Sequence, residues 1–97
     1  MGKNFNTTRQ IRIKSAASIL RALRAEPEMR NVLNNSADAI ERAVMTDSLS
    51  GLVTAKRKLR TLREVLDKRG GLDATILSEA LAGPIELLMP EGGLNQL

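Results

Sequence analysis

The segment DSLSGLVTAKRKLRTLREVLDKRGG, residues 47–71, decides the fold that this sequence predicts. Its apolar residues recur at intervals of three and four positions, which is the spacing of a heptad seam along one side of an α-helix. The residues of this seam are Leu52, Ala55, Leu59, Leu62 and Leu66. We therefore predict a helix from about Ser48 to Arg69, which Gly70 and Gly71 end because glycine readily adopts the backbone conformations found after a helix.

A second amphipathic pattern precedes this helix and begins at Pro27, a residue favoured in the first turn of a helix. Its apolar residues also recur at helical spacing, and they are Met29, Val32, Leu33, Ala37, Ile40, Ala43 and Val44. Thr46, Asp47 and Ser48 form a tight connection and supply a cap for the following helix. Residues 27–69 are therefore predicted to form an antiparallel helical hairpin with arms of nearly equal length.

The N-terminal segment predicts a further helix from Thr7 to about Ala25. Thr7 and Gln10 have the spacing of a capping box, in which the two side chains satisfy free backbone N–H groups. The apolar stripe of this helix contains Ile13, Ala16, Ala17, Leu20 and Leu23. An alternative interpretation stays open, because apolar and charged residues alternate in RQIRIK, residues 9–14, in a way that also suits a short strand.

The C-terminal quarter is rich in Leu and Ile and contains no Lys or Arg. Asp73 is placed to cap a short helix, ATILSEALA, and Gly83-Pro84 is expected to break the chain before one or two further turns in PIELLM. This segment either completes the core as a lid over the hairpin or serves as a self-association or partner-docking element.

The predicted fold is all-α: a small helical bundle built on an antiparallel helical hairpin, with an N-terminal helix and a short C-terminal helical segment. Residues 1–97 form a single helical domain in this prediction, because the chain is of one-domain size and no linker divides it. Loose tails are expected at residues 1–6 and 91–97.

The composition excludes several kinds of chemistry. With no Cys and no His in 97 residues, the chain can form neither disulfides nor the usual zinc sites. The acid pairs Asp38-Glu41 and Glu64-Asp67 lie beside Arg or Lys, so ordinary salt links explain them. Gly70-Gly71 lacks the flanking strand, the Lys and the Ser or Thr of a phosphate-binding loop. We therefore predict a protein that is not an enzyme and that has no catalytic residue, cofactor or metal.

Apolar stretches in this chain are short. None approaches the length of a transmembrane helix, and no apolar run follows the charged N-terminus. We therefore expect a soluble, cytoplasmic protein. Attachment to a membrane surface is not expected, because bulky interfacial Trp and Phe are absent from the predicted helices.

Charge is distributed in four blocks, although the net charge is only +4. Residues 1–30 hold seven basic and two acidic side chains, 31–50 hold one and three, 51–70 hold seven and two, and 71–97 hold none and four. A bundle that places basic and acidic blocks side by side would neutralise much of its own charge, whereas one that places both basic blocks on one face would bind anions. The sequence does not decide between these two arrangements.

Basic residues are the candidates for binding a protein or nucleic-acid partner. They are Lys56, Arg57, Arg60 and Arg63 in the hairpin and Arg9, Arg12, Arg21 and Arg24 in the N-terminal block. Lys56, Arg60 and Arg63 line one flank of the leucine seam, where they can contact phosphates or carboxylates. Against a nucleic-acid partner, Glu64 and Asp67 interrupt this flank, and one Phe with no Trp or Tyr provides no platform for base stacking.

RQIRIK, followed by SAASILRAL and then NNSADAIERAV, resembles the strand, helix and second helix of ribbon-helix-helix DNA-binding proteins. The resemblance covers roughly residues 9–44 and implies that Arg9, Ile11 and Ile13 or their neighbours lie on a paired strand. The sequence departs from the family pattern at Pro27, which falls where the first helix should end, and no Gly occupies the turn between the helices. We therefore do not assign the chain to this family.

The predicted function is binding without catalysis. The first hypothesis is a small regulatory, inhibitory or assembly protein that docks through basic amphipathic helices on a larger protein or nucleoprotein complex with an acidic surface. The alternative is direct binding of duplex DNA or RNA by the basic faces of the first and third helices. A homodimer contact through the seam at residues 52–66 is a further option that the sequence leaves open.

Overall fold

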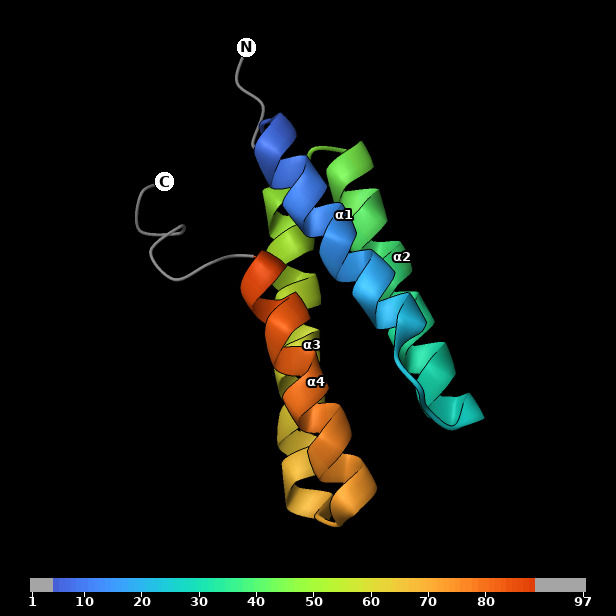
Figure 1. Cartoon of the computed structure of the whole chain (residues 1–97). Coiled ribbons are helices and arrows are strands. Elements are labelled where there is room, and N and C mark those ends of the chain that lie inside the picture. Colours follow the sequence, from blue (N-terminus) through green and yellow to red (C-terminus); the bar gives the residue numbers. More distant parts are fainter. Residues whose placement is uncertain (1–4, 89–97) are drawn as a thin grey trace.

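Capping side chains and turn residues define four helices in the computed structural model, which describes residues 5–88. The helices are α1 (Thr7–Ala22), α2 (Pro27–Met45), α3 (Leu49–Arg69) and α4 (Leu72–Leu88). They form an all-α bundle, as the sequence predicts (Figure 1). Residues 9–14 lie inside α1, so the strand interpretation is wrong, and with it the strand that a ribbon-helix-helix fold requires.

α1 begins at Thr7, as predicted, but its capping residue is Asn6 rather than Thr7. The Asn6 side chain accepts a hydrogen bond of 2.8 Å from the backbone N–H of Arg9. Asn caps a helix at least as well as Thr does. The Gln10 amide is then free to donate to the carbonyl oxygen of Phe5, 3.0 Å away, instead of closing a capping box.

The loose tails that the sequence predicts fall largely outside the described residues, and residues 91–97 lie wholly outside them. At the other end of the chain, Phe5 is only 1% exposed, and its backbone N–H donates to Asp47 Oδ1 over 3.3 Å. The prediction of a loose tail over residues 1–6 is therefore wrong at Phe5. This residue packs into the core and is tied to the connection between α2 and α3.

α1 ends at Ala22 and not near Ala25, because the chain must turn before the proline that starts α2. Pro27 disfavours helical geometry in the preceding residue, and Glu26 is extended, with φ −64° and ψ 159°. The guanidinium of Arg30 donates to two carbonyl oxygens in the last turn of α1 over 3.0 and 3.1 Å. These bonds satisfy oxygens that the end of a helix leaves without partners, and they join α1 to α2.

The predicted ends of α3 are confirmed. Asp47 adopts a left-handed φ of 52°, which Asp tolerates better than most residues, and Ser48 caps α3 by accepting a bond of 2.9 Å from the N–H of Gly51. At the other end, Gly70 has a φ of 69° and Gly71 a φ of 94°, a region that residues with a side chain avoid. The chain therefore reverses sharply into α4.

α4 continues through Gly83 and Pro84, where the sequence predicted a break. A proline inside a helix removes one hydrogen bond, and its ring crowds the residue before it. Here that residue is glycine, which has no Cβ for the ring to meet, and Pro84 is fully buried. The predicted short segment is thus one helix of 17 residues that spans the bundle beside α1 and α3.

α2 and α3 pack against each other across the short connection at residues 46–48, so the predicted hairpin of residues 27–69 is confirmed. The bundle also divides into two pairs of helices, α1–α2 and α3–α4, which we call the two hairpins from here on. Each helix packs against the next along the chain and α1 packs against α4, whereas α1 does not contact α3 and α2 does not contact α4 among the described residues. The hairpins meet at the end that carries the α2–α3 connection, residues 46–48, and diverge toward their tips at residues 23–26 and 70–71 (Figure 1). We call these the closed end and the open end.

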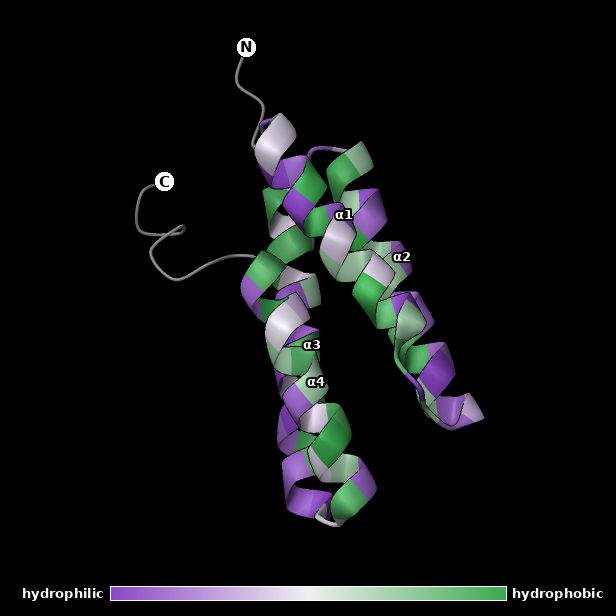
Figure 2. Ribbon diagram, viewed as in Figure 1, coloured by the Kyte–Doolittle hydropathy of each residue, from purple (hydrophilic) through white to green (hydrophobic). Residues whose placement is uncertain are grey.

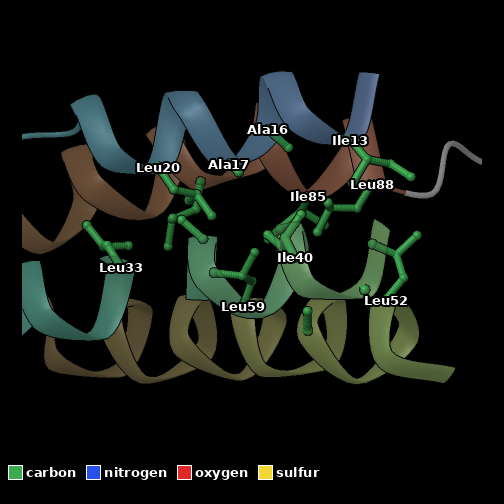
Figure 3. Packing of buried hydrophobic residues seen from close by; sticks show 14 of the residues in the cluster. Ile13, Ala16, Ala17, Leu20, Leu33, Ile40, Leu52, Leu59, Ile85 and Leu88 are labelled. Carbon is green, nitrogen blue, oxygen red and sulfur yellow. The ribbon is translucent and has the colours of Figure 1, made fainter. Parts of the chain in front are cut away.

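Large apolar side chains from all four helices fill the core. Figure 3 shows Ile13, Ile40, Leu52, Ile85 and Leu88 gathered between the helices, and each is at most 8% exposed. Burial of a side chain of this size contributes about 1.5–3 kcal/mol to folding. The five residues at the closed end are therefore a substantial source of stability.

The predicted apolar stripes are buried with few exceptions. The buried members are Ile13, Ala16, Ala17, Leu20, Leu33, Ala37, Ile40, Ala43, Val44, Leu52, Ala55, Leu59 and Leu66. Leu23, Met29 and Leu62 are half-buried, and Val32 is 43% exposed, so its assignment to the buried stripe of α2 is wrong. Because most of the seam at 52–66 is buried within one chain, it does not offer a surface for a homodimer contact.

Candidate binding surfaces

The two basic helices, α1 and α3, occupy diagonal positions in the bundle. α1 has four basic residues and no acidic one, and α3 has seven basic and two acidic residues. Between them lie α2, with three acidic and two basic residues, and α4, with three acidic residues and no basic one. The structure thus decides the question that the sequence left open: basic and acidic blocks lie side by side, and the two basic helices do not combine into one surface.

Arg21 of α1 is engaged with α2. Its guanidinium lies 2.6 Å from both Asp38 Oδ1 and Glu41 Oε1, so the salt links expected of this acid pair are formed. The hydrogen bond to Asp38, together with that to Glu41, raises the pKa of Arg21 above its ordinary value. A raised pKa stabilises the fold at every pH below the ordinary value, so this contribution is present throughout the neutral range.

The other candidate arginines of the N-terminal block do not form one patch. Arg9 and Arg12 are half-buried on α1, and Arg9 interacts with other groups of the chain. Arg24 lies beyond the end of α1 and is exposed at the open end. These arginines are therefore distributed along the length of the molecule.

The flank formed by Lys56, Arg60 and Arg63 faces α4. These residues share a helical stripe with Asp67, whose carboxylate accepts a bond of 2.6 Å from the Ser78 hydroxyl of α4. Lys56 and Arg63 are accordingly half-buried, and the Nε of Arg63 is buried with no partner among the described residues. Only Arg60 of this flank is exposed, so the three side chains do not form one docking edge.

Five cations of α3 are exposed and form no ion pair with any of residues 5–88. They are Arg57, Lys58, Arg60, Lys68 and Arg69, and we call them the α3 basic face. Lys68 and Arg69 also lie in the last turn, where cations stabilise the helix dipole. The other three lie in mid-helix and have no such role.

Three members of this face, Lys58, Lys68 and Arg69, were not among the predicted binding residues. The signal that points to them in the sequence is their position off the leucine seam, where a side chain is exposed whichever helix covers the seam.

A cleft of about 660 Å³ lies between the two hairpin tips at the open end. Its larger apolar lining residues are Leu23, Met29, Leu66, Leu72, Ile76 and Leu77, and its charged ones are Arg24, Glu26, Arg69 and Asp73. Figure 2 shows hydrophobic residues on α4 near this tip, beside the hydrophilic end of α3. Sequence reasoning missed the cleft because its walls come from both hairpins and depend on the angle between them.

A second, shallower hollow of about 340 Å³ lies between α2 and α3 near the closed end. Arg42 and Lys58 line it together with the hydroxyl-bearing residues Thr46, Ser50 and Thr54. The Thr46 hydroxyl donates to the carbonyl oxygen of Arg42 over 2.8 Å. Lys58 therefore extends the positive charge of α3 toward α2.

Among residues 5–88 there is no group of three acidic side chains placed to bind a metal ion. In the same part of the chain, no helix combines the length and the apolar character needed to cross a bilayer. Comparison of the chain with protein-family models, with curated proteins and with solved structures finds no match.

Proposed function

We propose that this chain is a non-catalytic binding protein of the regulatory, inhibitory or assembly type, which docks on an acidic surface of a larger protein through the α3 basic face. The observation that carries the proposal is the contrast between the two basic helices. On α1 only Lys14 is both exposed and without an ion pair, because Arg21 is paired with acids of α2, whereas α3 has five such cations among residues 5–88. A cytoplasmic location, expected from the sequence, is part of this proposal.

The α3 basic face suits a carboxylate-bearing partner for geometric reasons. Its cations extend from Arg57 to Arg69, about 18 Å along a straight helix at 1.5 Å per residue. Arg57, Arg60 and Arg69 can each hold a carboxylate with two parallel hydrogen bonds, which lysine cannot do. Unpaired charges of one sign also accelerate encounter with a surface of the opposite sign.

Duplex DNA or RNA is the alternative partner, and the arrangement of the helices favours it less. The basic residues of α1 lie diagonally across the bundle from α3, so they cannot add phosphate contacts to the same face. Glu64 also lies among the cations of α3, where it would repel phosphates.

Charge reversal on α3 tests the proposal. We would measure binding of a fluorescent glutamate-rich peptide to the wild type and to a variant carrying Arg57→Glu and Arg60→Glu. The matched control carries Arg12→Glu and Lys14→Glu, which change net charge equally on α1, the helix that lies diagonally across the bundle from α3. The proposal expects the α3 variant to bind at least roughly tenfold more weakly than the control, with helix content unchanged by circular dichroism.

Two outcomes would contradict the proposal. Equal weakening by both variants would mean that the peptide responds only to net charge. The second outcome comes from a duplex DNA oligomer that is titrated in parallel. If the DNA binds more tightly than the peptide, and if Arg57→Glu and Arg60→Glu remove a steep salt dependence of that binding, direct nucleic-acid binding replaces protein docking.

A further inference from the structure

The open end carries both a hollow and apolar side chains of a size to fill one. Leu72 is 75% exposed and Ile76 is 56% exposed, and both line the edge of the cleft. They lie four residues apart near the start of α4, so their side chains neighbour each other on one side of the helix. Leu23, Met29 and Leu77 are half-buried deeper in the same cleft. Contiguous exposed apolar residues of this kind mark an interaction site.

The charges around the cleft differ from those of α3 because both signs are present in equal number. The two cations are Arg24 and Arg69, and the two anions are Glu26 and Asp73. None of the four forms an ion pair with another of residues 5–88. A rim of mixed sign does not select a strongly acidic or a strongly basic partner. It does fit a surface with the same two cations and two anions.

We propose that a second copy of this chain occupies the cleft, in a two-fold symmetric dimer in which Leu72 and Ile76 of each copy enter the cleft of the other. In a two-fold interface the same patch faces itself, so such a patch must complement its own shape and its own charge. The cleft meets the first requirement because the hollow lies directly beside the protruding side chains of Leu72 and Ile76. It meets the second because the charged residues at its rim have a net charge of zero. The dimer leaves the exposed mid-helix cations of α3 outside the contact.

The mass of the protein in solution tests the proposal directly. Analytical ultracentrifugation over a range of concentrations should find a dimer for the wild type and a monomer for a variant carrying Leu72→Glu and Ile76→Glu. The matched control carries Met45→Glu and Ile11→Glu, which place the same two charges on apolar residues that are 84% and 62% exposed at the closed end and should leave the dimer intact. A wild type that stays monomeric at the highest concentration reached, or a control that dissociates as readily as the cleft variant, would overturn the proposal.

A rescue experiment establishes that the occupant is a second copy. The pair Arg24→Glu and Arg69→Glu makes the rim wholly acidic, and the pair Glu26→Lys and Asp73→Lys makes it wholly basic. Each variant alone should be monomeric through like-charge repulsion, and an equimolar mixture should form a heterodimer. Failure of the mixture to associate, with both variants folded by circular dichroism, would contradict the two-fold arrangement. Arg57→Glu and Arg60→Glu should not change the dimer, so this test is independent of docking through the α3 basic face.

Discussion

The closed and open ends are built from similar leucine-rich helices, yet the two hairpins pack together only at the closed end and leave a cleft between them at the open end. At the closed end, Phe5, Ile40 and Leu52 are all at most 1% exposed, because both hairpins contribute to one core. At the open end, Leu72 and Ile76 are also large apolar residues, but they are 75% and 56% exposed. Leu72 and Ile76 share the exposed side of α4 with Glu79, Gly83 and Glu86, whereas Ala74 and Leu81 lie on its buried side. The comparison teaches that the side of the helix decides which residues are buried, and that the divergence of the hairpins leaves a cleft beside the apolar residues on the exposed side.

The largest expected effect distinguishes the two ends directly. Leu52→Ala should lower the free energy of unfolding by about 2–5 kcal/mol, because it leaves a cavity where four helices pack. Leu72→Ala, the same substitution at the open end, should change it by no more than about 0.5 kcal/mol. Urea denaturation at low protein concentration measures both values. Similar losses at the two sites would mean that the open end is packed like the closed end.

Backbone geometry, rather than packing, shapes the tip of the α3–α4 hairpin. Gly70 has a φ of 69° and a ψ of −178°, a conformation nearly confined to glycine, and an added Cβ would meet nothing within 4 Å. Gly70→Ala should therefore destabilise the protein by about 1–3 kcal/mol through backbone strain alone. Lys68→Ala, two residues earlier in regular helix, is the control and should have little effect. A neutral Gly70→Ala would show that the chain does not turn in this way.

The closed end depends in part on one hydroxyl group. Ser48 Oγ accepts the N–H of Gly51 at the start of α3, and Ser48→Ala should cost about 1 kcal/mol by removing this cap. Ser50→Ala is the matched control, because among residues 5–88 the exposed Ser50 hydroxyl forms one hydrogen bond, with Ser48 Oγ 3.3 Å away, and does not cap the helix. Thermal denaturation of the two variants should separate them, and equal midpoints would argue against the cap.

The smallest expected effect concerns the two basic helices. Arg21→Ala should lower the denaturation midpoint slightly at low salt and not at high salt, because exposed ion pairs are weak and screened. Arg57→Ala should leave the midpoint unchanged at either salt concentration, since Arg57 has no ion pair among residues 5–88. If Arg57→Ala lowered the midpoint more than Arg21→Ala did, the cations of α3 could no longer be distinguished from Arg21 by their lack of an ion pair.

Much of the fold could be predicted because local signals coincide with the ends of the helices. Pro27 starts α2 and Gly70 ends α3, and in both places the backbone requirement of one residue decides the boundary. The residue that caps the start of α1 was harder to predict, because Asn6 and Thr7 are adjacent and the side chain of either can cap a helix. The break expected at Gly83-Pro84 was wrong because a proline that follows glycine meets less crowding than the general rule for proline assumes.

The candidate surfaces were less predictable because they depend on tertiary arrangement. The sequence identifies the seam of α3 and hence its exposed side, but not that α4 covers Lys56 and Arg63. It also contains no sign of the angle between the hairpins, which creates the cleft. Leu72 and Ile76 were assigned to a segment that completes the core or docks a partner, and only their exposure favours the second alternative.

The burial of Phe5 gives this protein a built-in spectroscopic reporter. Phe5 is its only aromatic residue, so any near-ultraviolet circular dichroism band and every aromatic proton resonance come from one ring. That ring is 1% exposed in the core, next to the α2–α3 connection. Ring-current shifts of neighbouring methyl groups would therefore report the packing of the closed end without a label. A partner or a second copy that binds at the open end could then be tested for its effect on the opposite end of the molecule.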